Sequence, residues 1–373
     1  MQITDDPELL ELMLSDLESA DPLYRPGNYW EIKTGPLVED LRSHGLRDIR
    51  RRRTPVLQSF GVGELGPGTQ EPTPLDRTVR RVAAGLERRG RRLAGRLPGG
   101  LGARFARPAR ASSPHYGVTP ERLRRLAVEH VRLRAEGTRA RPLAELDISL
   151  AGNPEDVFEG DGRPVTMSVL HYYLRYVYCC RHVDFRDVGV VVELGCGSGR
   201  QAEILKKLHP HLTVLLFDLV PQLYIAEQLL SAAFPGEVVS YRRTRDFQDL
   251  HRDVVPGRIH LLPAWRFPLL GGWSWDLFWN AASFQEMEPG LVRNYLGYVN
   301  AGARLVYLQE LFSGKPPARR AGAPGVLQPV TLRDYEGGLP RFQRRDLSPS
   351  WMPLGPQEEE GPYHDSWWSL QAR

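Results

Sequence analysis

The sequence predicts an α/β fold in which a helical N-terminal region precedes a largely parallel sheet. Two observations predict it. From residue 188 onward, short apolar runs alternate with helix-compatible stretches, and the runs lack the polar alternation of a sheet with one solvated face. A glycine-rich turn joins the first apolar run to the first of these helices, as in sheets that bind ligands at their strand ends. We therefore expect a helical region over residues 1–165 and a sheet-bearing domain over 166–373.

The expected elements follow from hydrophobic periodicity. Apolar residues recur at helical spacing over 5–20 and 120–135, and a third helix over 166–181 leads into the sheet. The elements expected after it are strands 188–194, 213–217, 259–262, 275–279 and 303–309, and helices 200–208, 221–233 and 289–299. Beyond residue 313 the chain is rich in proline and glycine and ends with several aromatic residues. This tail either closes the sheet or flanks a site.

Composition narrows the class of protein. The chain has 373 residues, of which 41% are hydrophobic, and no apolar run approaches the roughly 18 residues of a membrane span. Its first residues are acidic and amphipathic, unlike a secretory signal. The cysteines, Cys179, Cys180 and Cys196, have the spacing of neither a disulfide framework nor a zinc site. These features favour a cytoplasmic protein without a structural metal.

A basic segment interrupts the N-terminal region. Residues 42–141 contain 24 arginines and 8 acidic residues, and leucines and valines over 75–97 give a basic amphipathic pattern, followed by a linker over 98–114. This segment could be a helix with a solvated arginine face, a lid over an anionic substrate, or a surface for nucleic acid or membrane. Few aromatic residues are interleaved with the arginines, which makes single-stranded nucleic acid the less favoured partner.

The most informative motif is the run Glu193-Leu194-Gly195-Cys196-Gly197-Ser198-Gly199. Glycines let a backbone approach a ligand closely, and the following helix N-terminus offers free N–H groups. Asp218 ends the next apolar run, where an acid can accept hydrogen bonds from a ribose. A dinucleotide fold wants a glycine where Arg200 stands, so a dehydrogenase is disfavoured. The E-x-G-x-G-x-G form resembles motif I of class I S-adenosylmethionine (SAM) methyltransferases, which implies a Rossmann-like sheet.

That resemblance implies roles for residues at the other strand ends. Glu193, Gly195, Gly197 and Gly199 would cradle the methionine part of SAM, and Asp218 with Leu219 would hold the ribose side. Ala264 and Trp265 follow the third strand, where these enzymes hold the adenine, although Trp265 could equally be a buried core residue. The segment beginning at Asn280 would face the methyl donor and acceptor. It lacks the D/N-P-P-Y/F signature of adenine N-methylation.

A hydroxyl acceptor benefits from a base within hydrogen-bond reach. The candidates are Glu286, His171 and Glu310. Glu286 has the best position, but it could instead cap the following helix. His171 could be an ordinary core histidine, and Glu310 could only bind substrate. The oxygen ligands near Glu286 have no diagnostic spacing, so no metal is assigned.

Together these features resemble the sugar O-methyltransferases of bacterial polysaccharide and natural-product gene clusters. The resemblance covers Tyr24–Glu31, the Gly152-Asn153-Pro154 turn, the Leu170–Tyr178 helix, the glycine motif and Asn280–Met287. It implies methyl transfer from SAM to a hydroxyl of a sugar, glycosylated metabolite or polysaccharide; the arginine-rich residues 75–113 have no counterpart in it. The alternatives are an RNA-directed methyltransferase and a non-catalytic protein with a vestigial pocket. The protein could form a homo-oligomer under any of these three functions.

Overall fold

The computed structural model describes residues 3–65, 119–353 and 363–371. Its centre is an eight-stranded sheet in the order β5-β6-β4-β3-β7-β8-β10-β9. The first six in this order are parallel, and β10 pairs antiparallel with both β8 and β9. The strands are β3 (Val190–Leu194), β4 (Thr213–Asp218), β5 (Val238–Val239), β6 (Ile259–Pro263), β7 (Trp275–Ala281), β8 (Ala303–Glu310), β9 (Phe342–Pro349) and β10 (His364–Leu370). The α/β fold with a parallel-dominated sheet is thus confirmed.

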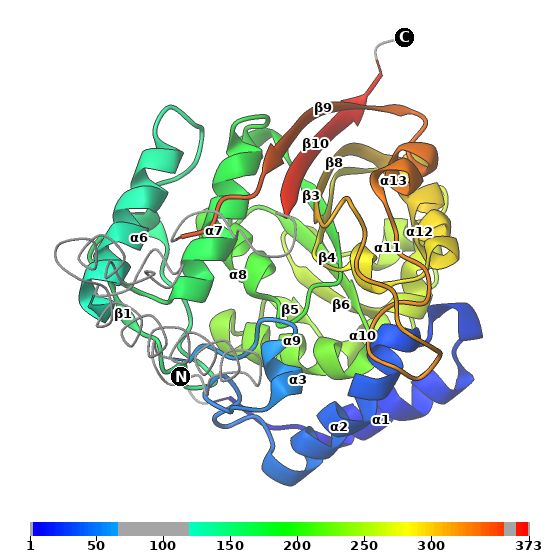
Figure 1. Cartoon of the computed structure of the whole chain (residues 1–373). Coiled ribbons are helices and arrows are strands. Elements are labelled where there is room, and N and C mark those ends of the chain that lie inside the picture. Colours follow the sequence, from blue (N-terminus) through cyan, green and yellow to red (C-terminus); the bar gives the residue numbers. More distant parts are fainter. Residues whose placement is uncertain (1–2, 66–118, 354–362, 372–373) are drawn as a thin grey trace, which may run out of the picture.

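Helices cover both faces of the sheet (Figure 1), with α7 and α8 on one side and α12 and α13 on the other. Successive strand residues point to opposite faces, so Val191 belongs to one core cluster and Val192 to the other. The helices are α1 (Pro7–Ser19), α2 (Asn28–His44), α3 (Pro55–Gln58), α6 (Pro120–Ala135), α7 (Met167–Cys180), α8 (Arg200–Leu208), α9 (Val220–Ala233), α10 (Tyr241–Thr244), α11 (Leu250–Asp253), α12 (Pro289–Gly302) and α13 (Leu332–Gly338). A small hairpin, β1 (Phe158–Gly160) and β2 (Arg163–Val165), precedes α7.

The N-terminal region is helical, as expected, and packs directly on the sheet domain. Leu9 of α1 and Leu37 of α2 lie in the same core cluster as Val191. The division expected between residues 165 and 166 remains a prediction. The arginine-rich helix expected over 75–97 lies outside the described residues. No helix in the described ranges is long and apolar enough to cross a membrane.

A buried four-charge network fixes the helix that follows the glycine motif. Arg200, the first residue of α8, donates to Glu203 at 2.6 Å and to Glu64 at 2.7 Å, and all three side chains are buried. Arg50 lies 3.9 Å from Glu203 and donates to the carbonyl of Ser149. Breaking such a buried pair leaves an uncompensated charge, so the network holds residues 50–64 firmly against the N-terminus of α8.

The tail closes the sheet, which was one of the two expected outcomes. Its last strand, β10, inserts between β8 and β9 with the register His364 to Glu310 and Trp367 to Tyr307. The start of β10 also reaches the strand ends, because the Tyr363 hydroxyl accepts from Gln285 Nε2 at 2.8 Å.

Candidate functional site

The glycine turn after β3 has the geometry that the motif predicted. Gly195, Gly197 and Gly199 all have positive φ angles, of 78°, 56° and 75°. A Cβ atom on Gly195 would collide with Ser283 of the β7 loop, whereas one on Gly199 would meet Leu230 of α9 at 2.7 Å. Gly195 therefore permits a close approach at the strand ends, and Gly199 permits the packing of α8 against α9.

Asp218 holds the glycine turn in place. Its Oδ2 accepts from the Gly197 amide and its Oδ1 from the Leu219 amide, both at 2.7 Å. Burial raises the pKa of this carboxyl to about 7, against the lowering effect of the two backbone donors. The second strand end and the glycine turn are thus one rigid unit.

Two connected cavities lie over this unit at the carboxyl ends of the strands. The outer chamber, about 360 Å³, is walled by residues 22–27 on one side and by Leu219, Ala264, Met287 and Tyr295 on the other. The inner chamber, about 260 Å³, reaches Glu193, Gly197, Phe60 and Gln222. The residues that line both chambers are Trp30, Gly195, Asp218, Ser283 and Glu286.

One face of α7 forms the polar wall of the inner chamber. Ser168, His171, Tyr172 and Arg175 all line it, at helical spacings of three, four and seven residues. The N-cap Thr166, whose side chain accepts from the Val169 amide, fixes the start of this helix two residues before Ser168. Only His171 of the stripe was predicted. The spacing itself was the available signal for the other three.

Arg175 and Glu193 form an incompletely paired buried couple. Arg175 Nε and Glu193 Oε2 are both buried and make no hydrogen bond within the described part of the chain. Burial raises the pKa of Glu193 to about 8, and the nearby guanidinium of Arg175 only partly offsets this. A buried unsatisfied polar atom is costly, so Arg175 can take an anionic group of a ligand and Glu193 can take a donor group, and a cationic donor would lower the pKa of Glu193 again.

His171 lines the inner chamber as a neutral imidazole. Burial, assisted by the positive charge of Arg175, holds the pKa of His171 well below its usual value of 6.5. Its ring lies 6.0 Å from that of Tyr172, which belongs to the same stripe. The side chain therefore faces the cavity and is not a core histidine sealed away from it.

Glu286 projects between the two chambers and is already held by two donors. Its Oε2 accepts from Trp30 Nε1 at 3.1 Å, and its Oε1 forms an ion pair with Lys315 Nζ at 2.7 Å. It does not cap α12; Glu288 occupies that N-cap position. Glu286 is thus available to the site, but its charge is partly compensated.

Four predicted residues line neither chamber. Glu310 accepts from the amides of Ser283, Phe284 and Gln285, so both of its oxygens hold the β7 loop instead of reaching substrate. Asn280 donates to the Leu194 carbonyl at 2.8 Å and accepts from the Phe284 amide, which ties two strand ends together. Trp265 packs against both core clusters, and Gly199 faces α9.

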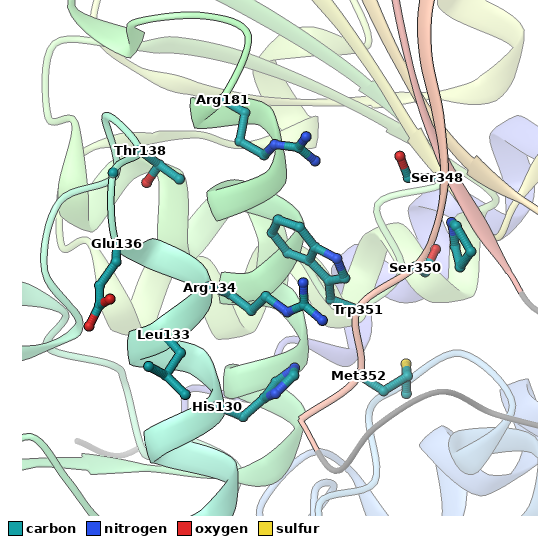
Figure 2. Close-up of a pocket in the computed structure, with 12 residues that line it drawn as sticks. His130, Leu133, Arg134, Glu136, Thr138, Arg181, Ser348, Ser350, Trp351 and Met352 are labelled. Carbon is teal, nitrogen blue, oxygen red and sulfur yellow. The ribbon is translucent and has the colours of Figure 1, made fainter.

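A more voluminous cavity than either chamber, of about 900 Å³, lies elsewhere. It is an open groove between α6, the end of α7 and residues 348–352, and it contains no predicted site residue (Figure 2). Trp351 lies there with the guanidinium groups of Arg134 and Arg181 at 4.8 and 5.4 Å from its ring. In the described residues, no three His, Cys, Asp or Glu side chains are grouped as metal ligands would be.

No family model matches this chain, and no curated protein does. Among solved structures, the mitomycin 7-O-methyltransferase MmcR is similar at 14% identity and a TM-score of 0.35, over 55% of this chain and 54% of that one. The magnesium protoporphyrin IX methyltransferase of Synechocystis, with S-adenosylhomocysteine (SAH) bound, is similar at 10% identity and a TM-score of 0.36, over 55% and 85%. The neocarzinostatin O-methyltransferase NcsB1 is similar at 18% and 0.33, over 54% and 56%.

The likeness thus spans about half the length of the mitomycin and neocarzinostatin enzymes. Because it is this distant, the function of the present chain has to be argued from its own site.

Proposed function

We propose that this protein is a SAM-dependent O-methyltransferase that methylates a hydroxyl of a sugar or a glycosylated small molecule. The observation that carries the proposal is the two-chambered cavity over the glycine turn, with an apolar chamber and a charged chamber meeting at Asp218. SAM has matching parts, a nucleoside and a zwitterionic amino acid, joined at a methylated sulfonium.

The cofactor would span both chambers. The adenine would occupy the outer chamber among Leu219, Ala264 and Tyr295, with its ribose on Asp218. In the inner chamber, Glu193 would accept from the cofactor's ammonium group. Arg175 would bind its carboxylate, since a guanidinium matches a carboxylate in geometry as well as charge.

Within the inner chamber, His171 is the proposed base. The acceptor oxygen attacks the methyl carbon in line with the departing sulfur, and the imidazole of His171 takes the hydroxyl proton. The products are SAH, a methyl ether and a proton held on His171. A carboxylate bound to Arg175 would offset the charge that lowers the pKa of His171, so cofactor binding would make the imidazole a better base. Glu286 would orient the hydroxyl from the β7 side.

The other predicted residues would act through the backbone. Glu310 and Asn280 are proposed as positioning residues that fix the β7 loop, where Ala282 adopts the left-handed φ of 58°. Such strained residues persist where the surroundings over-determine them. The rings of Trp30 and Phe60 pack edge-to-face with their centroids 5.8 Å apart, and both residues line the inner chamber. With the hydroxyls of Ser59 and Ser168 this makes a small amphipathic space, which suits a polyhydroxylated ring.

The test is methyl transfer from radiolabelled SAM to a panel of simple sugars and glycosides. We expect a methyl ether product with at least one of them, and the product should be lost when His171 is replaced by Asn. The His130→Asn variant, which alters a histidine in the groove of Figure 2, is the matched control and should retain activity. SAH binding without transfer to any hydroxyl acceptor would contradict the proposed reaction.

A further inference from the structure

Two of the four lysines of this chain meet beside Glu286. Lysine is rare here, with four among 49 basic residues. Lys33 belongs to α2 and Lys315 follows β8, yet their ammonium groups lie 3.7 and 4.2 Å from the centre of the same Tyr29 ring. We call Lys33 and Lys315 the lysine pair. It joins the N-terminal region to the carboxyl ends of the strands.

The lysine pair carries more positive charge than its surroundings neutralise. Glu286 forms an ion pair with Lys315 at 2.7 Å. No carboxylate of the described residues lies within ion-pair distance of Lys33, whose ammonium rests on the rings of Tyr29 and Trp30. An aromatic face attracts a cation but leaves its charge in place. Burial and the neighbouring Lys315 accordingly lower the pKa of Lys33, and Glu286 only partly opposes them.

The position of this charge matters because it adjoins the site. Lys33 and Lys315 are half-buried, and their contacts Trp30 and Glu286 line both chambers. Neither lysine itself lines a chamber, so an anion bound by the lysine pair would reach the proposed reacting hydroxyl past Trp30 or Glu286. We infer that the lysine pair binds an acidic group of the acceptor, a carboxylate or a phosphate, so that the substrate is an acidic hydroxylated compound. This inference rests on the proposed methyl transfer.

The experiment compares three probes that share the same sugar ring and differ at one carbon. Glucose, glucuronate and glucose 6-phosphate are titrated into the full chain saturated with SAH, and binding is followed by calorimetry and ligand-observed NMR. We expect at least one acid to bind about tenfold more tightly than glucose, and to lose that advantage in Lys33→Met and in Lys315→Met. Which acid binds distinguishes a carboxylate from a phosphate. Added salt should weaken acid binding and leave glucose unaffected.

Controls separate charge from structure. Lys315→Arg keeps the charge and should keep most of the preference for acid. Lys207→Met removes a lysine that donates to the Ala233 carbonyl and should change nothing at the site. Equal binding of the three probes, no binding of either acid, or acid binding that persists in the Lys33→Met, Lys315→Met double variant would overturn the inference. Failure of the wild type to bind SAH would contradict the proposed function instead, so the two failures are distinguishable.

Discussion

The outer and inner chambers share five residues but differ in chemistry. The outer chamber is bounded mainly by apolar residues and by residues 22–27, and it shares Asp218 with the inner chamber. The inner chamber contains the ionisable side chains of Glu193, Arg175 and His171, and burial raises the pKa of Glu193 and lowers the pKa of His171. The outer chamber has few polar atoms left to satisfy. The inner chamber holds a buried carboxyl oxygen of Glu193 and the Nε of Arg175, neither of which has a hydrogen-bond partner among the described residues.

This difference indicates that the two chambers bind different parts of one ligand. An apolar chamber contributes affinity through buried area, whereas buried polar groups without partners select for complementary polar groups on the ligand. One cofactor lying across Gly195 and Asp218 would thus be bound by its nucleoside in one chamber and recognised by its amino acid in the other. Variants confined to one chamber should therefore change one ligand fragment and not the other.

The largest expected effect belongs to the inner chamber alone. Replacing His171 with Asn should lower kcat by about 10²–10⁴-fold, the usual contribution of a positioned base. SAH affinity should stay nearly unchanged, because the proposed contact is with the acceptor. Steady-state kinetics and calorimetry measure the two quantities on the same sample. A variant that loses SAH binding and kcat together would assign His171 to the cofactor instead.

Arg175→Met should separate the two chambers at the level of binding. Loss of a charged hydrogen bond of about 1.5–3 kcal/mol predicts SAH binding that is roughly 10–150-fold weaker. Adenosine, which has no amino acid, should bind the variant as it binds the wild type. Arg134→Met, which alters an arginine in the separate groove of Figure 2, is the matched control. Equal losses of affinity for SAH and adenosine would contradict the assignment of the amino acid to the inner chamber.

Leu219→Ala tests the outer chamber. Leu219 lines the outer chamber only, and truncating a leucine that covers a ligand costs about 1–2 kcal/mol of binding. We expect SAH and adenosine to lose affinity by the same factor, about tenfold. Competition binding against a fluorescent nucleoside would measure both. A loss limited to SAH would place the adenine elsewhere.

The last prediction concerns stability and pH. The pKa of Glu193 is about 8 in the folded protein, above the ordinary 4.5, so the folded state keeps a proton that the unfolded chain has lost. The contribution of Glu193 to the stability of the ligand-free protein should therefore fall as the pH rises from about 5 to 8. Glu193→Gln removes this contribution, so its stability relative to the wild type should rise by about 4 kcal/mol between pH 4.5 and pH 8.

Thermal unfolding at several pH values measures this difference. Glu159→Gln, a substitution at an exposed position in β1, serves as the control. A stability advantage of Glu193→Gln that did not change with pH would show that Glu193 is not protonated in the folded protein.

The sequence predicted the parallel strands and the glycine turn because both depend on local signals. Apolar runs bounded by helices mark buried strands, and Gly195 and Asp218 lie where those strands end. The strands β9 and β10 were missed because they carry charged and polar residues such as Arg344 and Asp365, so they lack the apolar pattern of the inner strands. The helix α2 was missed because Pro36 lies inside it, and a proline usually ends or kinks a helix.

Side-chain direction at the strand ends could not be predicted. Glu286 and Glu310 follow neighbouring strands, yet Glu286 faces the chambers and Glu310 accepts three amides of the β7 loop. The choice depends on hydrogen bonds between segments far apart in the chain. The same holds for Trp30 and Phe60, which reach the site from the N-terminal region. Arg175, by contrast, could have been found, since it lies one helical turn after His171 on a helix that was expected.

The most direct test of the central claim is calorimetric titration of SAH into the wild type and into Asp218→Ala. Asp218 joins the two chambers and holds the glycine turn through Gly197 and Leu219. We expect binding on the order of micromolar for the wild type, and binding at least about tenfold weaker for the variant. A wild-type protein that does not bind SAH, or a variant that binds it equally well, would contradict the claim that this cavity is a SAM site.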